Sequence, residues 1–127
     1  MMDKFKENYK KYMKLLYQNL FYNHLAFKDF DALDSEDRAY IESLLERIEQ
    51  IDAIIVNHLS NYTIDRLNLV DLSIIRIAVY ELLKKEIQPE IIINEAIELT
   101  KEFSDLDDEK QHKFTNKLID NIYKSMK

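Results

Sequence analysis

The feature that most limits the fold of this chain is the absence of glycine: its 127 residues include none, and only one proline. Tight hairpins and turns with positive φ rely on glycine, so a chain without it favours helices joined by short turns. Loops that cradle phosphates also need glycine, which excludes dinucleotide-binding fingerprints and P-loops. The absence of cysteine excludes disulfides, thiolate zinc sites and cysteine nucleophiles. We therefore predict an all-α protein.

Composition indicates a single domain. Apolar residues make up 46% of the chain and charged residues 33%, which suits a filled core and a soluble surface. No apolar run approaches the roughly 18 residues that would span a membrane, and the first residues lack the apolar segment of a signal peptide. We expect a cytoplasmic protein that makes no membrane contact.

The spacing of apolar residues predicts a long helix over residues 4–23 and a second helical pattern that begins after Asp34, a predicted N-cap. The second pattern is long for one helix, so a break is expected near residues 50–52. The core-facing residues of the first helix are Phe5, Tyr9, Tyr12, Met13, Leu16 and Leu20. Those of the second pattern are Ile41, Leu44, Leu45, Ile48, Ile51, Ile55 and Leu59.

The middle of the chain predicts a boundary followed by a central helix. The helical pattern lapses at residues 61–63, and a short helical turn is expected over residues 64–67. Asn68 is a predicted N-cap, with Asp71 three residues on. Because apolar residues surround most of the following helix, over residues 69–86, we expect it to lie at the centre of the protein.

Two further helices are predicted at the end of the chain. Pro89 suits the first turn of a helix that ends near Phe103. The acidic residues 105–109 are expected to cap a last helix that ends near Ser125. The prediction is one compact domain over residues 1–127, made of two three-helix subdomains: residues 1–62 and residues 63–127.

The sequence contains no pattern typical of a catalytic or metal site. His24, His58 and His112 are far apart and share no metal-ligand spacing. Arg76 and Glu95 each lie in a strongly apolar segment where a lone charge would be costly, so we expect them to form an ion pair between helices. No catalytic residue, metal or cofactor is predicted, and the chain is not expected to be an enzyme.

The first helix carries lysines on one face, beside an aromatic residue. Lys6, Lys10, Lys14 and Tyr17 lie within one sector of roughly 80°, and Tyr17 is at the border with the core face. Ammonium groups can meet phosphates while a ring stacks on a base, so this pattern suits single-stranded RNA. The alternative is an amphipathic helix whose lysines are merely solvated.

The last helix repeats this arrangement. Its lysine stripe has Phe114 at the margin, as an exposed ring away from the core face. The two stripes would form one surface if the terminal helices pack side by side. The lysines of this stripe are Lys110, Lys113, Lys117 and Lys124, and the core face consists of Thr115, Leu118, Ile119 and Ile122. The net charge of −6 comes mostly from an acidic segment, residues 29–52, so the basic ends and acidic middle permit two different partners.

The second half of the chain resembles the NusB family of transcription antitermination factors. The resemblance covers residues 61–123 in order and spacing, and is weaker before them, where LYQ at residues 16–18 fits the family's first helix. Its motifs are NYTIDRL from residue 61, VDLSIIRIAVYEL from residue 70, INEAIELTKEF from residue 93 and HKFTNKLID from residue 112.

The resemblance implies an RNA-binding adaptor. Proteins of this family bind the boxA element of ribosomal RNA leader transcripts as a heterodimer with NusE, a small ribosomal subunit protein, and join an RNA polymerase antitermination complex. It assigns Asp71 and Ile75 to the side that faces NusE. It assigns RNA binding to the terminal helices, through Lys4, Lys6, Lys10, Lys14, Tyr17, Lys113, Phe114 and Lys117.

The chain departs from the family pattern at three places. No arginine precedes Arg38, and Lys117 and Lys110 stand where the family commonly has glycine and an acid. Lysine lacks the planar guanidinium with which arginine binds phosphate through two hydrogen bonds. We therefore expect weaker RNA binding or a greater dependence on NusE. Two alternatives remain: a helical adaptor that binds only proteins, and a domain related to those of ribosomal RNA methyltransferases.

Overall fold

The computed structural model of the chain describes residues 2–21, 34–60, 63–104 and 110–127. Within these ranges it contains six α-helices, one short 3-10 helix and no strand, which confirms the all-α prediction. None of the described helices is long and apolar enough to cross a membrane. The elements are α1 (Met2–Phe21), α2 (Ser35–Glu46), α3 (Ile48–Asn57), η2 (Ile64–Arg66), α4 (Leu69–Lys84), α5 (Pro89–Phe103) and α6 (Lys110–Ser125).

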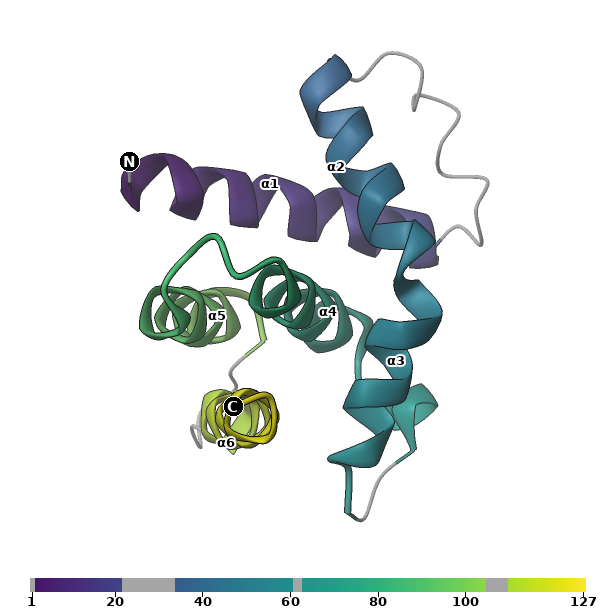
Figure 1. The fold of residues 1–127 in the computed structure, drawn as a ribbon. Helices are drawn as coiled ribbons and strands as arrows, with labels where there is room; N and C mark the ends of the chain where they lie inside the picture. Colours follow the sequence, from purple (N-terminus) through teal and green to yellow (C-terminus); the bar gives the residue numbers. More distant parts are fainter. Residues whose placement is uncertain (1, 22–33, 61–62, 105–109) are drawn as a thin grey trace.

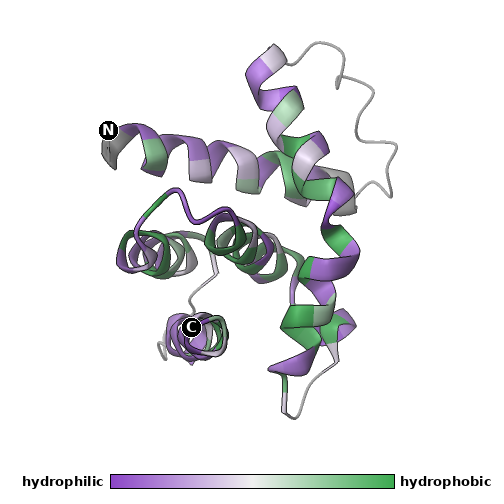
Figure 2. Cartoon of the chain, in the orientation of Figure 1, coloured by the Kyte–Doolittle hydropathy of each residue, from purple (hydrophilic) through white to green (hydrophobic). Residues whose placement is uncertain are grey.

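Helix α4 is the centre of the fold, as predicted. Every residue of α4 from Asp71 to Leu82 is buried, and the helix packs against α1, α3, α5 and α6. Figure 1 shows these four helices around it, with α1 on one side and α6 on the other. In Figure 2, α4 is mostly hydrophobic, whereas α6 is mostly hydrophilic and lies at the periphery. A helix that is hydrophobic on most of its surface is stable when other helices cover it.

The predicted helix starts are confirmed by their caps. The Asp34 carboxylate accepts hydrogen bonds from the backbone N–H groups of Glu36 and Asp37, each at 3.0 Å, and so begins α2. The Asn68 side chain accepts from the Asp71 N–H at 2.8 Å and donates to the Asp71 carboxylate at 2.9 Å. These bonds satisfy backbone donors that the first helical turn cannot pair internally. Pro89 is the first residue of α5, as expected. The capping role predicted for residues 105–109 lies outside the described residues.

The predicted break in the second helical pattern is displaced. It falls at Arg47, between α2 and α3, rather than at residues 50–52. A bend there keeps both apolar stripes on the core, because Ile41 and Leu44 before it and Ile51 and Ile55 after it are all fully buried. The polar Gln50 and Asp52 lie inside α3 and do not interrupt it.

Asp52 has a different role, and it corrects a second prediction. Arg76 donates from Nε and Nη2 to the two carboxylate oxygens of Asp52, at 2.8 and 2.7 Å. The predicted ion pair between Arg76 and Glu95 is therefore wrong. Glu95 has a buried Oε2 atom without a hydrogen-bond partner among the described residues. Burial raises the pKa of Glu95, while the nearby Lys6 acts in the opposite direction.

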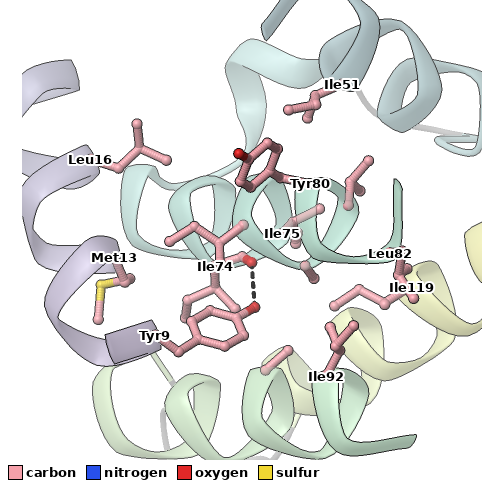
Figure 3. Packing of buried hydrophobic residues seen from close by; sticks show 14 of the residues in the cluster. Tyr9, Met13, Leu16, Ile51, Ile74, Ile75, Tyr80, Leu82, Ile92 and Ile119 are labelled. Carbon is pink, nitrogen blue, oxygen red and sulfur yellow. Dashed lines mark hydrogen bonds between the residues drawn. The ribbon is translucent and has the colours of Figure 1, made fainter. Parts of the chain in front are cut away.

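Tyrosines fix α1 and α2 onto α4. The Tyr9 hydroxyl, deep in the core, donates to the carbonyl oxygen of Ile74 at 2.6 Å (Figure 3). Tyr12 of α1 stacks on Tyr40 of α2, with ring centroids 3.8 Å apart, and Tyr40 donates to the buried Glu81 carboxylate at 2.6 Å. Burial and the Glu81 charge raise the pKa of Tyr40. The orientation of α1, and hence of its lysines, is set by these contacts.

Candidate nucleic-acid interface

The predicted division of α1 into a core face and a lysine face is present in the structure. Tyr9, Tyr12, Met13 and Leu16 are buried, and Phe5 packs partly against them. On the other face Lys4, Lys6 and Lys14 are exposed, and Lys10 and Tyr17 are partly exposed. The side chain of Leu20 lies outside the described residues. The lysines are thus available at the surface.

The lysine face of α1 borders the outer edge of α5. The Lys10 ammonium lies 2.7 Å from the Glu102 carboxylate. The ammonium nitrogens of Lys10 and Lys14 lie 5.3 and 5.4 Å from the centre of the Phe103 ring, within the range of a cation–π contact. The aromatic ring among these lysines is therefore Phe103, in addition to Tyr17 on α1 itself.

Helix α6 has the predicted core face, but Phe114 differs from the prediction. Thr115, Leu118, Ile119 and Ile122 are buried, whereas Lys110, Lys113 and Lys117 are exposed. Phe114 is half-buried and packs against the core rather than standing exposed at the margin. The core holds the Phe114 ring in place, and part of the ring surface remains exposed.

Two hollows adjoin Phe114. One, of about 330 Å³, separates η2 and the start of α4 from the start of α6. The other, of about 150 Å³, lies between the end of α3 and α6. Both are lined by Phe114. The larger hollow is also lined by Arg66, Leu67, Asn68, Asp71, Lys110 and Gln111. The smaller is also lined by His58, Leu59, Ser60, Lys117, Leu118 and Asn121.

The two lysine surfaces are joined by the end of α5 and not by direct packing of the terminal helices. Figure 1 shows α4 and α5 between α1 and α6, so these helices do not lie side by side as the sequence suggested. The link is a hydrogen bond of 3.3 Å from the Asn68 amide to the hydroxyl of Ser104, the residue after Phe103. Asn68 lines the larger hollow beside Phe114. Asn68 therefore connects the end of α5, next to Phe103, with the hollow beside Phe114.

Three residues of this surface were not predicted: Phe103, His58 and Arg66. Phe103 follows the buried Leu99 and Thr100 at helical spacing, which is the pattern of a core residue. Its exposure results from its place at the end of α5, beyond the main core. The His58 ring Nδ1 lies 2.9 Å from the Ile54 carbonyl oxygen and donates to it, so Nδ1 carries the proton. No local sequence signal marks these positions.

The two residues assigned to the partner side differ in accessibility. Asp71 is almost entirely buried but lines the larger hollow. Ile75 is fully buried. We therefore assign Ile75 to the core and retract it as a direct partner contact, since a side chain without accessible surface cannot touch a second protein.

The described residues include no group of three or more acidic, histidine or cysteine side chains that could hold a metal ion. His58 caps the end of α3, His112 lies in α6, and His24 lies outside the described residues. The surface presents ammonium groups and aromatic rings, which bind anionic, flat ligands.

Known proteins share this sequence and this fold. A transcription antitermination protein NusB from Exiguobacterium sp. is 42% identical over 99 residues, which are 73% of this chain and 75% of that protein. The protein of the same name from Clostridium perfringens is 36% identical over 128 residues, 91% and 93% of the two chains. Both alignments extend over most of each protein.

Solved structures with a similar fold include a NusB protein. T. maritima NusB superposes with a TM-score of 0.79 at 29% identity, covering 94% of this chain and 89% of that one. A chain in a crystal structure described as a plectonemic RNA supercoil superposes with a TM-score of 0.77 at 25% identity, covering 95% and 94%. A model of the NusB family matches residues 4–124. The chain belongs to the NusB family of transcription antitermination proteins.

Proposed function

We propose that this protein binds boxA-type single-stranded RNA of ribosomal RNA leader transcripts, together with NusE, within an RNA polymerase antitermination complex. The observation that carries the proposal is the cluster of the Lys10 and Lys14 ammonium groups at the Phe103 ring, whose neighbour Ser104 is bonded to Asn68 at the hollow beside Phe114. Lysines bind the phosphates and rings stack on bases, which together bind a single strand. A related chain occurs in a structure described by its RNA, which supports this reading.

The residues proposed to bind RNA fall into two chemical groups. The phosphate-binding group consists of Lys4, Lys6, Lys10, Lys14, Lys113 and Lys117. The stacking group consists of Tyr17 and Phe114. We propose that NusE contacts the neighbourhood of Asp71 at the larger hollow, which would bring both partners to the same end of the protein.

The test is RNA binding measured by electrophoretic shift across a series of salt concentrations, with and without NusE. A Lys10→Glu, Lys14→Glu double variant should lose affinity on every RNA and show a shallower salt dependence, because each lost phosphate contact removes about 0.7 from the slope. Tyr17→Ala or Phe114→Ala should weaken binding by roughly 1–3 kcal/mol with an unchanged slope. Equal boxA binding by the fully substituted protein would overturn the proposal.

A second candidate function is an adaptor that binds only proteins. The net charge of −6 and the pairing of Lys10 with Glu102 favour it. The same experiment separates the two functions, since an adaptor of this kind would bind NusE but leave boxA RNA unshifted in the presence or absence of NusE.

A further inference from the structure

Phe103 combines exposure with a fixed position. It is 38% exposed, and only Val56, at 49%, is a more exposed large hydrophobic side chain among the described residues. The helical turn before it is anchored by Leu99 and Thr100, which are both buried. A single exposed apolar side chain is ordinary on a protein surface, so its neighbours decide what it can bind. The surroundings of the ring indicate which ligand.

Those surroundings are cationic on the α1 side. Lys10 and Lys14 are one turn apart and both point their ammonium groups at the ring, at 5.3 and 5.4 Å from its centre. A nucleotide carries a flat base and a phosphate on its sugar, so a ring flanked by ammonium groups matches both the base and the phosphate. Lysine is depleted in protein–protein interfaces, which makes a protein partner a poorer fit.

We propose that Phe103 is a base-stacking residue of the RNA surface, with Lys10 and Lys14 binding the phosphates on either side of the stacked nucleotide. The inference rests on the proposed RNA binding and adds a contact on α5 to those on α1 and α6. It explains how one strand can pass between the two lysine surfaces, since Ser104 next to Phe103 is bonded to Asn68 at the hollow beside Phe114. Stacking tolerates any base, so Phe103 adds affinity more than sequence preference.

Binding requires one rearrangement. Glu102 now holds the Lys10 ammonium, and the two side chains are 48% and 39% exposed. A pair so exposed is weak and exchangeable, so a phosphate can replace the Glu102 carboxylate on Lys10. The cation–π contacts are also weak at an exposed site, which allows a base to take the ring face.

The chain contains no tryptophan, so a single substitution provides a site-specific optical test. In Phe103→Trp, the only indole of the protein should lose emission when a boxA-carrying single-stranded RNA is added, because the base stacks on it. Tyr123→Trp is the matched control. Tyr123 also lies under a lysine, with the Lys127 ammonium 5.0 Å from its ring centre, but it is outside the proposed surface, and its emission should not change.

A second variant, Phe103→Leu, keeps an apolar side chain and removes the stacking ring. Its RNA affinity should fall by roughly 5-fold to 150-fold with the salt slope unchanged, the range expected for one stacked base. Circular dichroism and thermal unfolding check that it is folded, and the Phe103→Trp result stands independently if it is not.

The possible outcomes separate the role of Phe103 from the proposed RNA binding of the whole protein. If the wild-type protein binds no RNA with or without NusE, both are overturned. If the wild type binds RNA but Phe103→Leu binds within 2-fold of it, or the Phe103→Trp emission stays constant at saturation, only the role of Phe103 is overturned. If Phe103→Leu loses NusE and retains RNA, Phe103 is a protein contact and the inference is wrong.

Discussion

Two contacts between helices bring opposite charges together at the same distance, yet they differ in burial and geometry. Between α3 and α4, Arg76 binds Asp52 through two hydrogen bonds, and the side chains are 10% and 29% exposed. Between α1 and α5, Lys10 meets Glu102 through one contact of 2.7 Å, and the side chains are 39% and 48% exposed. Distance alone would make them equivalent.

The difference between these contacts separates a part of the fold from a part of the binding surface. When one partner of a buried pair is lost, the other charge is stranded away from water, which is strongly destabilising. When an exposed pair is opened, water solvates both groups and little free energy is lost. Arg76 and Asp52 therefore hold α3 on α4, whereas Lys10 can exchange Glu102 for a phosphate.

The largest effect is expected for the pair that contains the buried Arg76. Asp52→Ala should lower the free energy of unfolding by about 3 kcal/mol, because it leaves the Arg76 guanidinium without a counter-charge. The measurement is urea unfolding followed by circular dichroism. Asp52→Asn, which retains a hydrogen-bond acceptor, is the milder matched variant. A loss for Asp52→Ala below about 0.5 kcal/mol, the range of ordinary surface changes, would contradict the assignment.

A smaller effect is expected for Glu95, on the same helix as Glu102, whose buried Oε2 atom has no hydrogen-bond partner among the described residues. Burial raises the pKa of Glu95, so its ionised form destabilises the folded state. The stability that this group contributes is fully present below its ordinary pKa of 4.5 and is lost as the pH rises through the raised value. Glu95→Gln cannot ionise.

Glu95→Gln should therefore melt above the wild type at neutral pH, and the difference should shrink as the pH falls through the raised pKa of Glu95 and level off below 4.5. Thermal unfolding at a series of pH values measures this difference. A gap that is independent of pH would mean that the ionisation of Glu95 is not its cause.

The smallest change in stability is expected at the exposed pair. Glu102→Gln should alter the free energy of unfolding by less than about 0.5 kcal/mol, and it should raise RNA affinity up to about 5-fold because Lys10 loses its internal competitor. Glu98→Gln is the matched control: it removes the same charge from the same helix, but Glu98 contacts Lys101, at 3.8 Å, and not Lys10. An equal gain in both variants would mean that general charge, and not competition for Lys10, determines the affinity.

Much of the fold follows from local patterns in the sequence. The 3.6-residue period identified the buried faces of α1 and α6, and the chemistry of Asp34, Asn68 and Pro89 identified where α2, α4 and α5 begin. These features depend on residues within one or two helical turns, so the sequence carries them directly. The break at Arg47 was missed by a few residues because it depends on how α2 and α3 both reach the core.

The candidate site was predictable only in part. The lysines of α1 and α6 are on their expected faces. The helical pattern already suggested that Tyr17 and Phe114 beside them suit single-stranded RNA, and the resemblance to the NusB family implies the same. The partner of Arg76 was predicted wrongly, since a lone arginine in an apolar helix indicates that a counter-charge exists but not which neighbouring helix supplies it.

The sequence by itself determined that this protein is helical, where most of its helices start, which faces are buried, and that it belongs to the NusB family. Tertiary structure alone decided that Asp52 neutralises Arg76 and that Phe103 lies beneath two lysines of α1. It also decided that a buried oxygen of Glu95 has no partner within the part of the chain that the structure describes. The physical reason is the distance along the sequence over which each interaction acts. Periodicity and capping act between residues a few positions apart, whereas ion pairs and ring contacts between helices depend on which helices pack together and where they cross.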